Sequence, residues 1–150
     1  MSVLIHVNRT HDADPDLPLP SYKTPGAAGA DLRADTGGRT VTIRPGHRAL
    51  ISTGLRIALP DGYEMQIRPR SGLALKHGLT LANSPGTIDS DYRGPVQVLL
   101  LNLGDAPFDV THGMRIAQGV VAPVVQARWE IAEELSGTDR GGNGFGSTGA

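Results

Sequence analysis

The clearest pattern in the chain is an alternation of side chains from position 48 to position 59. One set consists of Ala49, Ile51, Thr53, Leu55, Ile57 and Leu59, with Arg48, Leu50, Ser52, Gly54, Arg56 and Ala58 between them. A period of two predicts a β-strand with one face in the core. Residues 60–62 read Pro-Asp-Gly and predict a turn, and residues 63–68 alternate again. We therefore expect a β-hairpin across this turn.

A second pattern is a turn-rich stretch, residues 83–94, that leads into a continuous apolar run, residues 96–103. The run predicts a strand buried on both faces. The turn-rich stretch carries Asp89, Asp91 and Tyr92. An acid and an aromatic ring on a tight loop beside a buried strand are typical of a binding or catalytic site. An ordinary hairpin with solvated aspartates has the same pattern, so both interpretations stay open here.

The only convincing helix is short, residues 72–77, with Ser71 as its cap and Gly78 as its stop. Arg70 and Ser71 at its start would suit an anion, although a capped helix with solvated arginines is equally compatible. Further strands are expected at 3–7, 41–43 and 108–110, with one or two more within 114–125.

Composition narrows the fold class and the kinds of partner. The 20 glycines and 11 prolines leave little room for long helices and favour an all-β fold of short strands. A chain of 150 residues is typical of one domain, and the absence of cysteine excludes disulfides and cysteine-based zinc sites. A net charge of -1 argues against a duplex nucleic acid partner. We find no signal peptide or bilayer-spanning stretch, and so expect no membrane partner and a soluble protein of the cytoplasm.

The end of the chain, residues 140–150, is too rich in glycine to hold a fold and is expected to be a flexible arm on a body of residues 1–139. Its side chains and the backbone N–H groups between its glycines could wrap a phosphate chain. A formal dinucleotide fingerprint starts at Gly144, but no helix or second βαβ unit follows it. The side chains that could contact a ligand here are Arg140, Phe145, Ser147 and Thr148.

Taken in order, five segments of the chain resemble those of the trimeric dUTPases. The resemblance extends over most of the chain through these segments, which read Ala28-Gly-Ala-Asp-Leu32, Arg70-Ser-Gly-Leu-Ala-Leu-Lys-His-Gly78, Gly86-Thr-Ile-Asp-Ser-Asp-Tyr-Arg-Gly94, Arg115-Ile-Ala-Gln-Gly119 and Arg140-Gly-Gly-Asn-Gly-Phe-Gly-Ser-Thr-Gly149. The resemblance implies an all-β, jelly-roll-like distorted β-barrel with one short helix and a flexible glycine-rich C-terminal arm. It also implies a homotrimer with shared sites that cleaves dUTP to dUMP and pyrophosphate, with water attacking the α-phosphorus. That activity would keep uracil out of DNA and supply dUMP for thymidylate synthesis.

The resemblance also implies a role for individual residues. Asp89 would orient and deprotonate the attacking water, and Tyr92 would stack on the deoxyribose and exclude a 2′-hydroxyl. Asp31 would contact a magnesium ion (Mg²⁺) through water. The implied contacts to the uracil edge are Asn83, Thr87, Ile88 and Gln97. The implied contacts to the phosphates and the closing arm are Arg70, Ser71, Gly72, Gln118, Arg140, Phe145, Gly146, Ser147 and Thr148.

Two other functions remain to be weighed against this one. A dCTP deaminase has a similar fold and is also trimeric, but it would need a different acid–base arrangement and a pocket for cytosine. A β-fold interaction protein without catalysis is the second alternative, and the intact Asp89 argues against it.

Overall fold

The computed structural model describes residues 2–144, which fold mainly into β-strands. The described residues form ten strands and one α-helix. Their bounds are β1 His6–Arg9, β2 Ala30–Arg33, β3 Val41–Ile43, β4 Arg48–Ala58, β5 Tyr63–Arg68, α1 Ser71–His77, β6 Leu79–Leu81, β7 Gly86–Ile88, β8 Pro95–Asn102, β9 Phe108–Val110 and β10 Arg115–Pro123. No described helix has the length and apolar character needed to cross a membrane. The expected all-β class with one short helix is confirmed.

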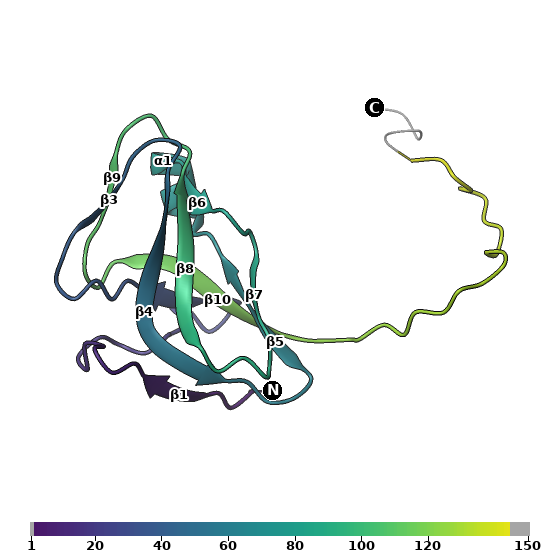
Figure 1. Cartoon of the computed structure of the whole chain (residues 1–150), viewed down its shortest axis with the longest axis horizontal. Helices are drawn as coiled ribbons and strands as arrows, with labels where there is room; N and C mark the ends of the chain where they lie inside the picture. Colours follow the sequence, from purple (N-terminus) through teal and green to yellow (C-terminus); the bar gives the residue numbers. More distant parts are fainter. Residues whose placement is uncertain (1, 145–150) are drawn as a thin grey trace.

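The strands form two four-stranded sheets and a two-stranded ribbon (Figure 1). The first sheet has the order β1-β4-β8-β6, the second has the order β2-β10-β5-β7, and the ribbon is β3-β9. The pairs between named strands are antiparallel. The described strands do not close into a barrel. In place of the expected distorted barrel, they form two packed sheets.

The expected hairpin between β4 and β5 is wrong. β4 pairs with β1 and β8, whereas β5 pairs with β10 and β7. The turn at residues 60–62 therefore carries the chain from one sheet to the other. Ile57 and Leu59 enter the core from the side of the first sheet, and Met65 and Ile67 enter it from the side of the second. All four are buried in the same core. The two strands meet through their side chains across the sandwich rather than through their backbones.

The chain crosses between the sheets a second time at the turn-rich stretch. β7 is the last strand of the second sheet, and β8 lies inside the first. Residues 89–94 connect them, so this stretch is also not a backbone-paired hairpin. Among the described strands β7 has a partner only on its β5 side, so its other edge leaves backbone N–H and C=O groups without a strand partner.

The core lies between the two sheets, and β8 shows how a strand contributes to it. Val96, Val98 and Leu100 are at most 1% exposed, whereas Leu99 and Leu101 on the opposite face are half-buried. The expectation that this strand is buried on both faces therefore holds for only one face within a single chain. The remaining buried apolar residues of the core include Leu32, Ala34, Ile43, Ile51, Leu79, Leu81, Ile88, Val110, Ile116 and Ala117.

Helix α1 begins one residue earlier than expected. Ser71 is its first residue rather than its cap, and Arg70 occupies the cap position without a side-chain hydrogen bond to the helix. Gly78 ends the helix as expected, with φ of 67°, a left-handed conformation that favours glycine. The first strand also lies later than expected, at His6–Arg9.

A polar cluster ties the connection after β1 to the rest of the body. His112 Nε2 lies 2.8 Å from Asp14 Oδ2, and Thr36 N donates to His112 Nδ1 at 3.2 Å. The buried Asp35 carboxylate accepts a hydrogen bond from Asp14 N at 2.8 Å. The hydrogen bond from His112 holds the pKa of Asp14 below its usual value. The cluster therefore joins segments that are far apart in the sequence.

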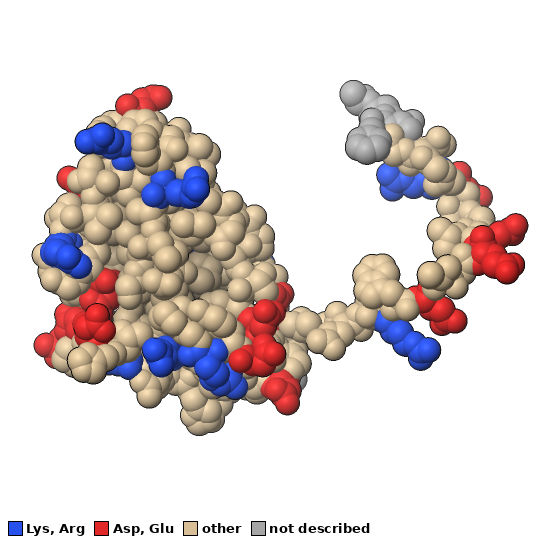
Figure 2. All heavy atoms as spheres, in the orientation of Figure 1, with Lys and Arg blue, Asp and Glu red and all other residues tan. Residues whose placement is uncertain are grey.

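The chain beyond β10 leaves the body as an extended segment (Figure 1). No strand or helix occurs in the described residues from 124 to 144. Four of its large apolar side chains are at least 90% exposed: Val125, Trp129, Ile131 and Leu135. Figure 2 shows acidic side chains gathered on the body where this segment leaves it.

Candidate active site

The residues expected to contact uracil and deoxyribose line one small cavity between β7 and β8. The cavity has a volume of about 140 Å³. The structure brings together all five of the residues named for this part of the site, because they lie within 15 positions of one another and the chain folds back there. The lining residues are Ile67, Asn83, Gly86, Thr87, Ile88, Tyr92, Pro95, Val96 and Gln97.

The wall of this cavity formed by β7 is rich in open backbone groups. Gly86–Ile88 pairs with β5 on one side and with no other strand of the part of the chain that the structure describes. A planar base placed against the other side could satisfy these N–H and C=O groups as a neighbouring strand would. The Asn83 amide lies close to Gly86 and adds a side chain that both donates and accepts hydrogen bonds. This wall can therefore recognise a base by hydrogen bonds in a fixed geometry.

Tyr92 is held at the mouth of the cavity by its neighbours in the turn. Its hydroxyl donates to Pro95 O at 3.1 Å, and its backbone N–H donates to Asp89 O at 3.2 Å. Its ring lies directly over Gly94, where a Cβ atom would be 2.5 Å from Tyr92 Cζ. Only glycine leaves room for the ring in this position.

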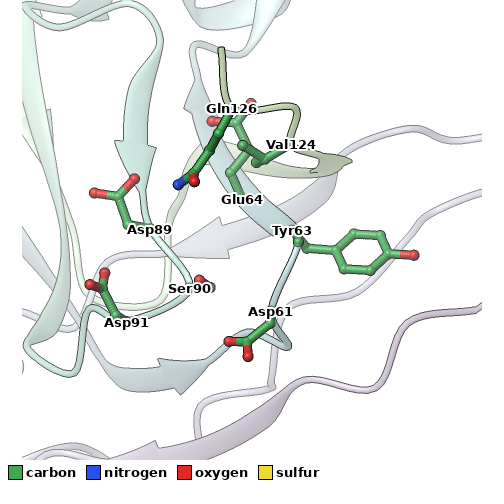
Figure 3. Close-up of a pocket in the computed structure, with 9 residues that line it drawn as sticks. Asp61, Tyr63, Glu64, Asp89, Ser90, Asp91, Val124 and Gln126 are labelled. Carbon is green, nitrogen blue, oxygen red and sulfur yellow. The ribbon is translucent and has the colours of Figure 1, made fainter. Parts of the chain in front are cut away.

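Asp89 lies next to the cavity, at the edge of a larger open hollow of about 770 Å³ (Figure 3). In Figure 3, Asp89 and Asp91 lie on one side of the hollow and Asp61 and Glu64 on the other, while the Tyr63 ring points away. The Asp89 side chain is exposed and makes no hydrogen bond or ion pair with another described residue. Its carboxylate is therefore available to a water molecule or a ligand.

The residues expected on the phosphate side are joined by a network of charged groups. Asp31, on β2, is 9% exposed. Its Oδ1 lies 3.2 Å from Arg70 Nε, and its Oδ2 lies 3.1 Å from Arg115 Nη1. Arg70 Nη1 also donates to the carbonyl oxygen of Arg115 at 3.2 Å. Arg115 was not named as a site residue from the sequence, since nothing in the pattern of β10 shows that its side chain reaches Asp31.

Gln118 supports the turn that leads into α1. Its Nε2 donates to Pro69 O at 2.9 Å, and a Cβ at Gly29 would be 2.9 Å from its Cδ. Gln118 thus holds the residue just before Arg70. A shallow hollow of about 490 Å³ opens beside it, lined by Gln66, Arg68, Pro69, Ser71, Ser84, Pro85 and Gln118. Gly72 follows Ser71 in the first turn of α1.

The base cavity and the phosphate-side hollow lie on opposite faces of β5. Ile67 lines the cavity, whereas its neighbours Gln66 and Arg68 line the hollow, and successive side chains of a strand point to opposite faces. Asp89 lines the large open hollow, whereas Ser71 lines the shallow hollow beside Gln118. One chain therefore presents the two halves of the expected site on different surfaces.

The arm residues stand apart from both halves. Arg140 is exposed, and its Nε donates to the nearby Asn143 O at 2.9 Å, the one hydrogen bond of this side chain within residues 2–144. The remaining arm residues named from the sequence, Phe145, Gly146, Ser147 and Thr148, lie outside the described residues.

The described residues fit a magnesium ion that is held mainly by a ligand and by water. They contain no cluster of three or more His, Cys, Asp or Glu side chains that could hold a metal by themselves. Each Asp31 oxygen already accepts from an arginine, but a carboxylate has about four acceptor positions, so contact through water is possible. Mg²⁺ commonly keeps several waters and binds substrate phosphates, which this donor set allows.

Comparison with known proteins identifies the family. The dUTPase family model matches residues 16–149. The chain is 69% identical to the deoxyuridine 5′-triphosphate nucleotidohydrolase of Roseobacter denitrificans over 137 residues, which cover 91% of this chain and 90% of that protein. It is 59% identical to the protein of the same name from Dinoroseobacter shibae over 153 residues, which cover 99% of each.

The fold agrees with a solved structure of the same kind. The dUTPase of Staphylococcus bacteriophage 80alpha, determined with dUpNHpp, superposes with a TM-score of 0.85 at 24% identity, covering 98% of this chain and 99% of that one. At this identity the similarity concerns the fold alone. The matches in sequence to the family model and to the two bacterial relatives are what show that the chain belongs to the dUTPase family.

Proposed function

We propose that the protein hydrolyses dUTP to dUMP and pyrophosphate by attack of water on the α-phosphorus. One observation carries the proposal: a cavity of about 140 Å³ contains Asn83, Thr87, Ile88, Tyr92 and Gln97, with the exposed carboxylate of Asp89 on the adjoining turn. The names of the bacterial relatives support the same substrate.

Uracil would be selected by the open edge of β7 and by Asn83. The backbone groups of Gly86–Ile88 and the Asn83 amide would pair with the donors and acceptors of the uracil edge. Cytosine presents the reverse pattern at positions 3 and 4, with an acceptor at N3 and a donor at the 4-amino group, and would leave buried groups unpaired, a mismatch that gives about 10⁴–10⁵ discrimination where a site is built around such bonds. The narrow cavity would exclude the methyl group of thymine by contact with the backbone near Tyr92.

The deoxyribose would lie against the ring of Tyr92. The ring is fixed on both sides, by Gly94 below it and by the hydrogen bond from its hydroxyl to Pro95 O. A ring that cannot move aside would leave no room for a 2′-hydroxyl. Discrimination against ribonucleotides would then come from steric exclusion.

Asp89 would act as the general base. Its carboxylate makes no hydrogen bond or ion pair within the described residues, so it can orient a water molecule and accept its proton. The turn that fixes Tyr92 also fixes Asp89, through the bond from Tyr92 N to Asp89 O. The sugar contact and the base would therefore be held in one geometry.

The phosphate chain would be bound by Arg70, Ser71, Gly72 and Gln118. Their cationic and hydrogen-bonding groups suit a triphosphate, whose transfer chemistry depends mainly on positioning and electrostatic stabilisation. A bound Mg²⁺ would supply further positive charge to the phosphate oxygens, with Asp31 holding its water. The arm, through Arg140, Phe145, Gly146, Ser147 and Thr148, would close over the nucleotide, with Phe145 on the base.

The complete site would form between the subunits of a homotrimer. The cavity between β7 and β8 and the hollow beside Gln118 lie on opposite faces of β5, which supports a site in which one nucleotide would contact groups from more than one chain. The outer face of the first sheet offers an interface, because Leu50 and Leu103 are 57% and 67% exposed there beside Leu99 and Leu101. A body of residues 1–139 and an arm of residues 140–150 that reaches a neighbouring site would complete this arrangement. The proposed number of three subunits comes from the family resemblance.

In the cell, the proposed reaction would lower the dUTP pool and produce dUMP. It would keep uracil out of DNA and supply the precursor for thymidylate synthesis. We place it in the cytoplasm with the nucleotide pool, acting on free dUTP without a nucleic acid or membrane partner.

The test is the identification of products. The purified protein is incubated with Mg²⁺ and dUTP, dCTP, dTTP or UTP, and pyrophosphate and ammonia are measured. We expect pyrophosphate and dUMP from dUTP alone. Release of ammonia from dCTP would instead identify a deaminase, and no turnover of any nucleotide would favour a binding protein.

A further inference from the structure

A row of three polar side chains runs along one face of β5. Glu64, Gln66 and Arg68 alternate with the buried Met65 and Ile67, so the row lies on the face turned away from the core. Gln66 Nε2 donates to Glu64 Oε1 at 2.7 Å. Gln66 Oε1 accepts from Arg68 Nε at 3.1 Å and from Arg68 Nη2 at 2.6 Å. The row therefore joins an acid to a base through one amide.

The chemistry of the row fixes the orientation of the Gln66 amide. A guanidinium group only donates hydrogen bonds, and a carboxylate only accepts them. The carbonyl oxygen of Gln66 must therefore face Arg68, and its NH₂ group must face Glu64. Because two N–H groups of Arg68 are bound to one oxygen, the arginine is held before any ligand arrives and loses less conformational entropy when it binds one.

The amide also keeps the acid away from the base. Glu64 and Arg68 are four residues apart on an extended strand, which separates their backbones by about 13 Å. Charges in about 0.1 M salt are screened over about 10 Å, so Glu64 offsets little of the charge on Arg68. The ion pairs between residues 2 and 144 do not include Arg68. Since its side chain is exposed, its positive charge is open to an anion.

Arg68 lies at the hollow where phosphate contacts are expected. It lines that hollow together with Ser71 and Gln118. In the pairing of β5 with β10, Arg68 is directly opposite Gln118. Residues directly opposite in an antiparallel pair share a face, with Cβ atoms about 5 Å apart. The hollow therefore combines a hydroxyl, an amide and a guanidinium group, and the guanidinium fork matches the geometry of phosphate oxygens.

We infer that Arg68 is a further phosphate-binding residue of this protein, with Gln66 as its positioning residue. The inference rests on the proposed function and deepens it, because it adds a cation to the phosphate contacts expected around α1. In the proposed trimer, a nucleotide would have its base in the cavity of one chain and its phosphates beside Arg68 of another. Glu64 contributes by fixing the direction of the Gln66 amide without neutralising the arginine.

An exchange of two side chains separates the charge of Arg68 from its support. In the exchange variant, Glu64→Gln with Gln66→Glu, the acid moves next to Arg68 and the amide moves to position 64. The net charge and the two side chains are the same in total, and Arg68 is held at least as firmly by a bidentate ion pair. Its positive charge, however, is neutralised. A role in phosphate binding predicts weaker binding in this variant, whereas a role in the fold alone predicts no change.

The experiment uses the full chain and two probes. dUpNHpp carries a chain of three phosphate groups, and deoxyuridine has the same base and sugar without phosphate. Affinity for dUpNHpp is measured by titration calorimetry and affinity for deoxyuridine by NMR titration, both with Mg²⁺ present, while light scattering follows assembly. The variants are Arg68→Met, Arg68→Lys and the exchange variant. The control is Arg44→Met, which removes an exposed arginine from the turn between β3 and β4.

We expect Arg68→Met to weaken binding of dUpNHpp by about 10-fold to 100-fold, the range for a lost hydrogen bond to a charged group. The exchange variant should weaken it by a similar factor. Arg68→Lys should weaken it less, because lysine keeps the charge without the planar fork. Binding of deoxyuridine should change by less than about threefold in every variant. Arg44→Met should bind both probes as the unmodified protein does.

An affinity for dUpNHpp that stays within about threefold of the unmodified value in Arg68→Met or in the exchange variant would overturn the inference. Equal losses for dUpNHpp and deoxyuridine would also overturn it, because they would indicate a general structural role. If Arg68→Met does not fold or assemble, the exchange variant and Arg68→Lys carry the test in the same way.

Failure of this inference can be told apart from failure of the proposed function. If the unmodified protein binds neither probe and releases no pyrophosphate from dUTP, both are wrong. If the unmodified protein binds dUpNHpp and turns over dUTP while the Arg68 and exchange variants bind dUpNHpp equally well, only this inference is wrong.

Discussion

Replacing Gly94 with alanine should convert a selective site into a less selective one. A Cβ at this position would lie 2.5 Å from Tyr92 Cζ and 2.9 Å from Tyr92 Cε2. Ordinary carbon–carbon contacts begin near 3.5 Å, so the ring must shift by about 1 Å. The hydroxyl would then lose its hydrogen bond to Pro95 O, now 3.1 Å long. A neutral hydrogen bond of this kind contributes about 0.5–1.5 kcal/mol, and overpacking costs about 1–3 kcal/mol more.

The expected result is a change in the ratio of kcat/KM for dUTP to kcat/KM for UTP. A displaced ring no longer blocks a 2′-hydroxyl, and a loss of about 1.4–2.8 kcal/mol of discrimination lowers this ratio by about 10-fold to 100-fold. Turnover of dUTP should fall less, because Asp89 keeps its carboxylate.

Two further variants separate the possible causes of such a change. Gly26→Ala is the matched control, since a Cβ there meets nothing within 4 Å. Tyr92→Phe keeps the ring and removes only the hydrogen bond to Pro95 O. It therefore measures how much of the change in the dUTP-to-UTP ratio is due to that bond. If Gly94→Ala folds and keeps the dUTP-to-UTP ratio within twofold, the ring is not held by Gly94 and the steric argument is wrong.

Three other predictions follow from the site, the arm and the cluster around His112. Asp89→Asn should reduce dUTP turnover by about 10²–10⁴-fold while dUpNHpp still binds, because the swap keeps shape and removes the proton acceptor; turnover close to that of the unmodified protein would assign the base elsewhere. A chain that ends at Asp139 should stay folded and assembled with little activity, and mixing it with Asp89→Asn chains should recover part of that activity; no recovery would mean that the arm closes over its own subunit. Asp14→Asn should be less stable than the unmodified protein near neutral pH. The pKa of Asp14 is lowered by His112 from its ordinary 3.8, so the stability it contributes is present above that value and is lost as the pH falls through the folded pKa. Urea unfolding at a series of pH values should show the two proteins converging on the acid side, and a difference that stays constant with pH would contradict the linkage.

The parts of the molecule that sequence reasoning predicted well are local ones. Alternation located β4 and β5 to within one residue, because period two depends only on which side chains face the core. The residues named for the base, from Asn83 to Gln97, line one cavity because they belong to one short stretch of chain, and their contacts with a base stay a prediction. Gly78 ended α1 because a left-handed residue there needs no tertiary partner.

The parts that were missed depend on relations between distant segments. The pattern of β4 and β5 predicted a hairpin, but β4 pairs with β8 and β5 pairs with β10. These pairings prevail because they align the apolar faces of the strands across the core. Arg115 was overlooked because a bulge turns its side chain to the opposite face of β10. The amino-acid composition of a strand does not indicate a bulge. The role of Gly94 could not be inferred either, since it depends on where the Tyr92 ring lies.

The position of the cavity between β7 and β8 has a consequence for the local opening motions of this protein. β7 and β8 belong to different sheets, so the cavity can widen only if the sandwich itself loosens. Short edge strands usually exchange their amide hydrogens through small local openings, whereas core strands exchange only when the whole domain opens. The outward amides of β7 should exchange quickly in the empty protein and become as slow as those of β8 once a base covers them. Mutations in the shared core at residues that do not line the cavity, such as Val98 or Met65, should then alter which base is accepted without touching it, because they change the spacing of the sheets that shape the cavity.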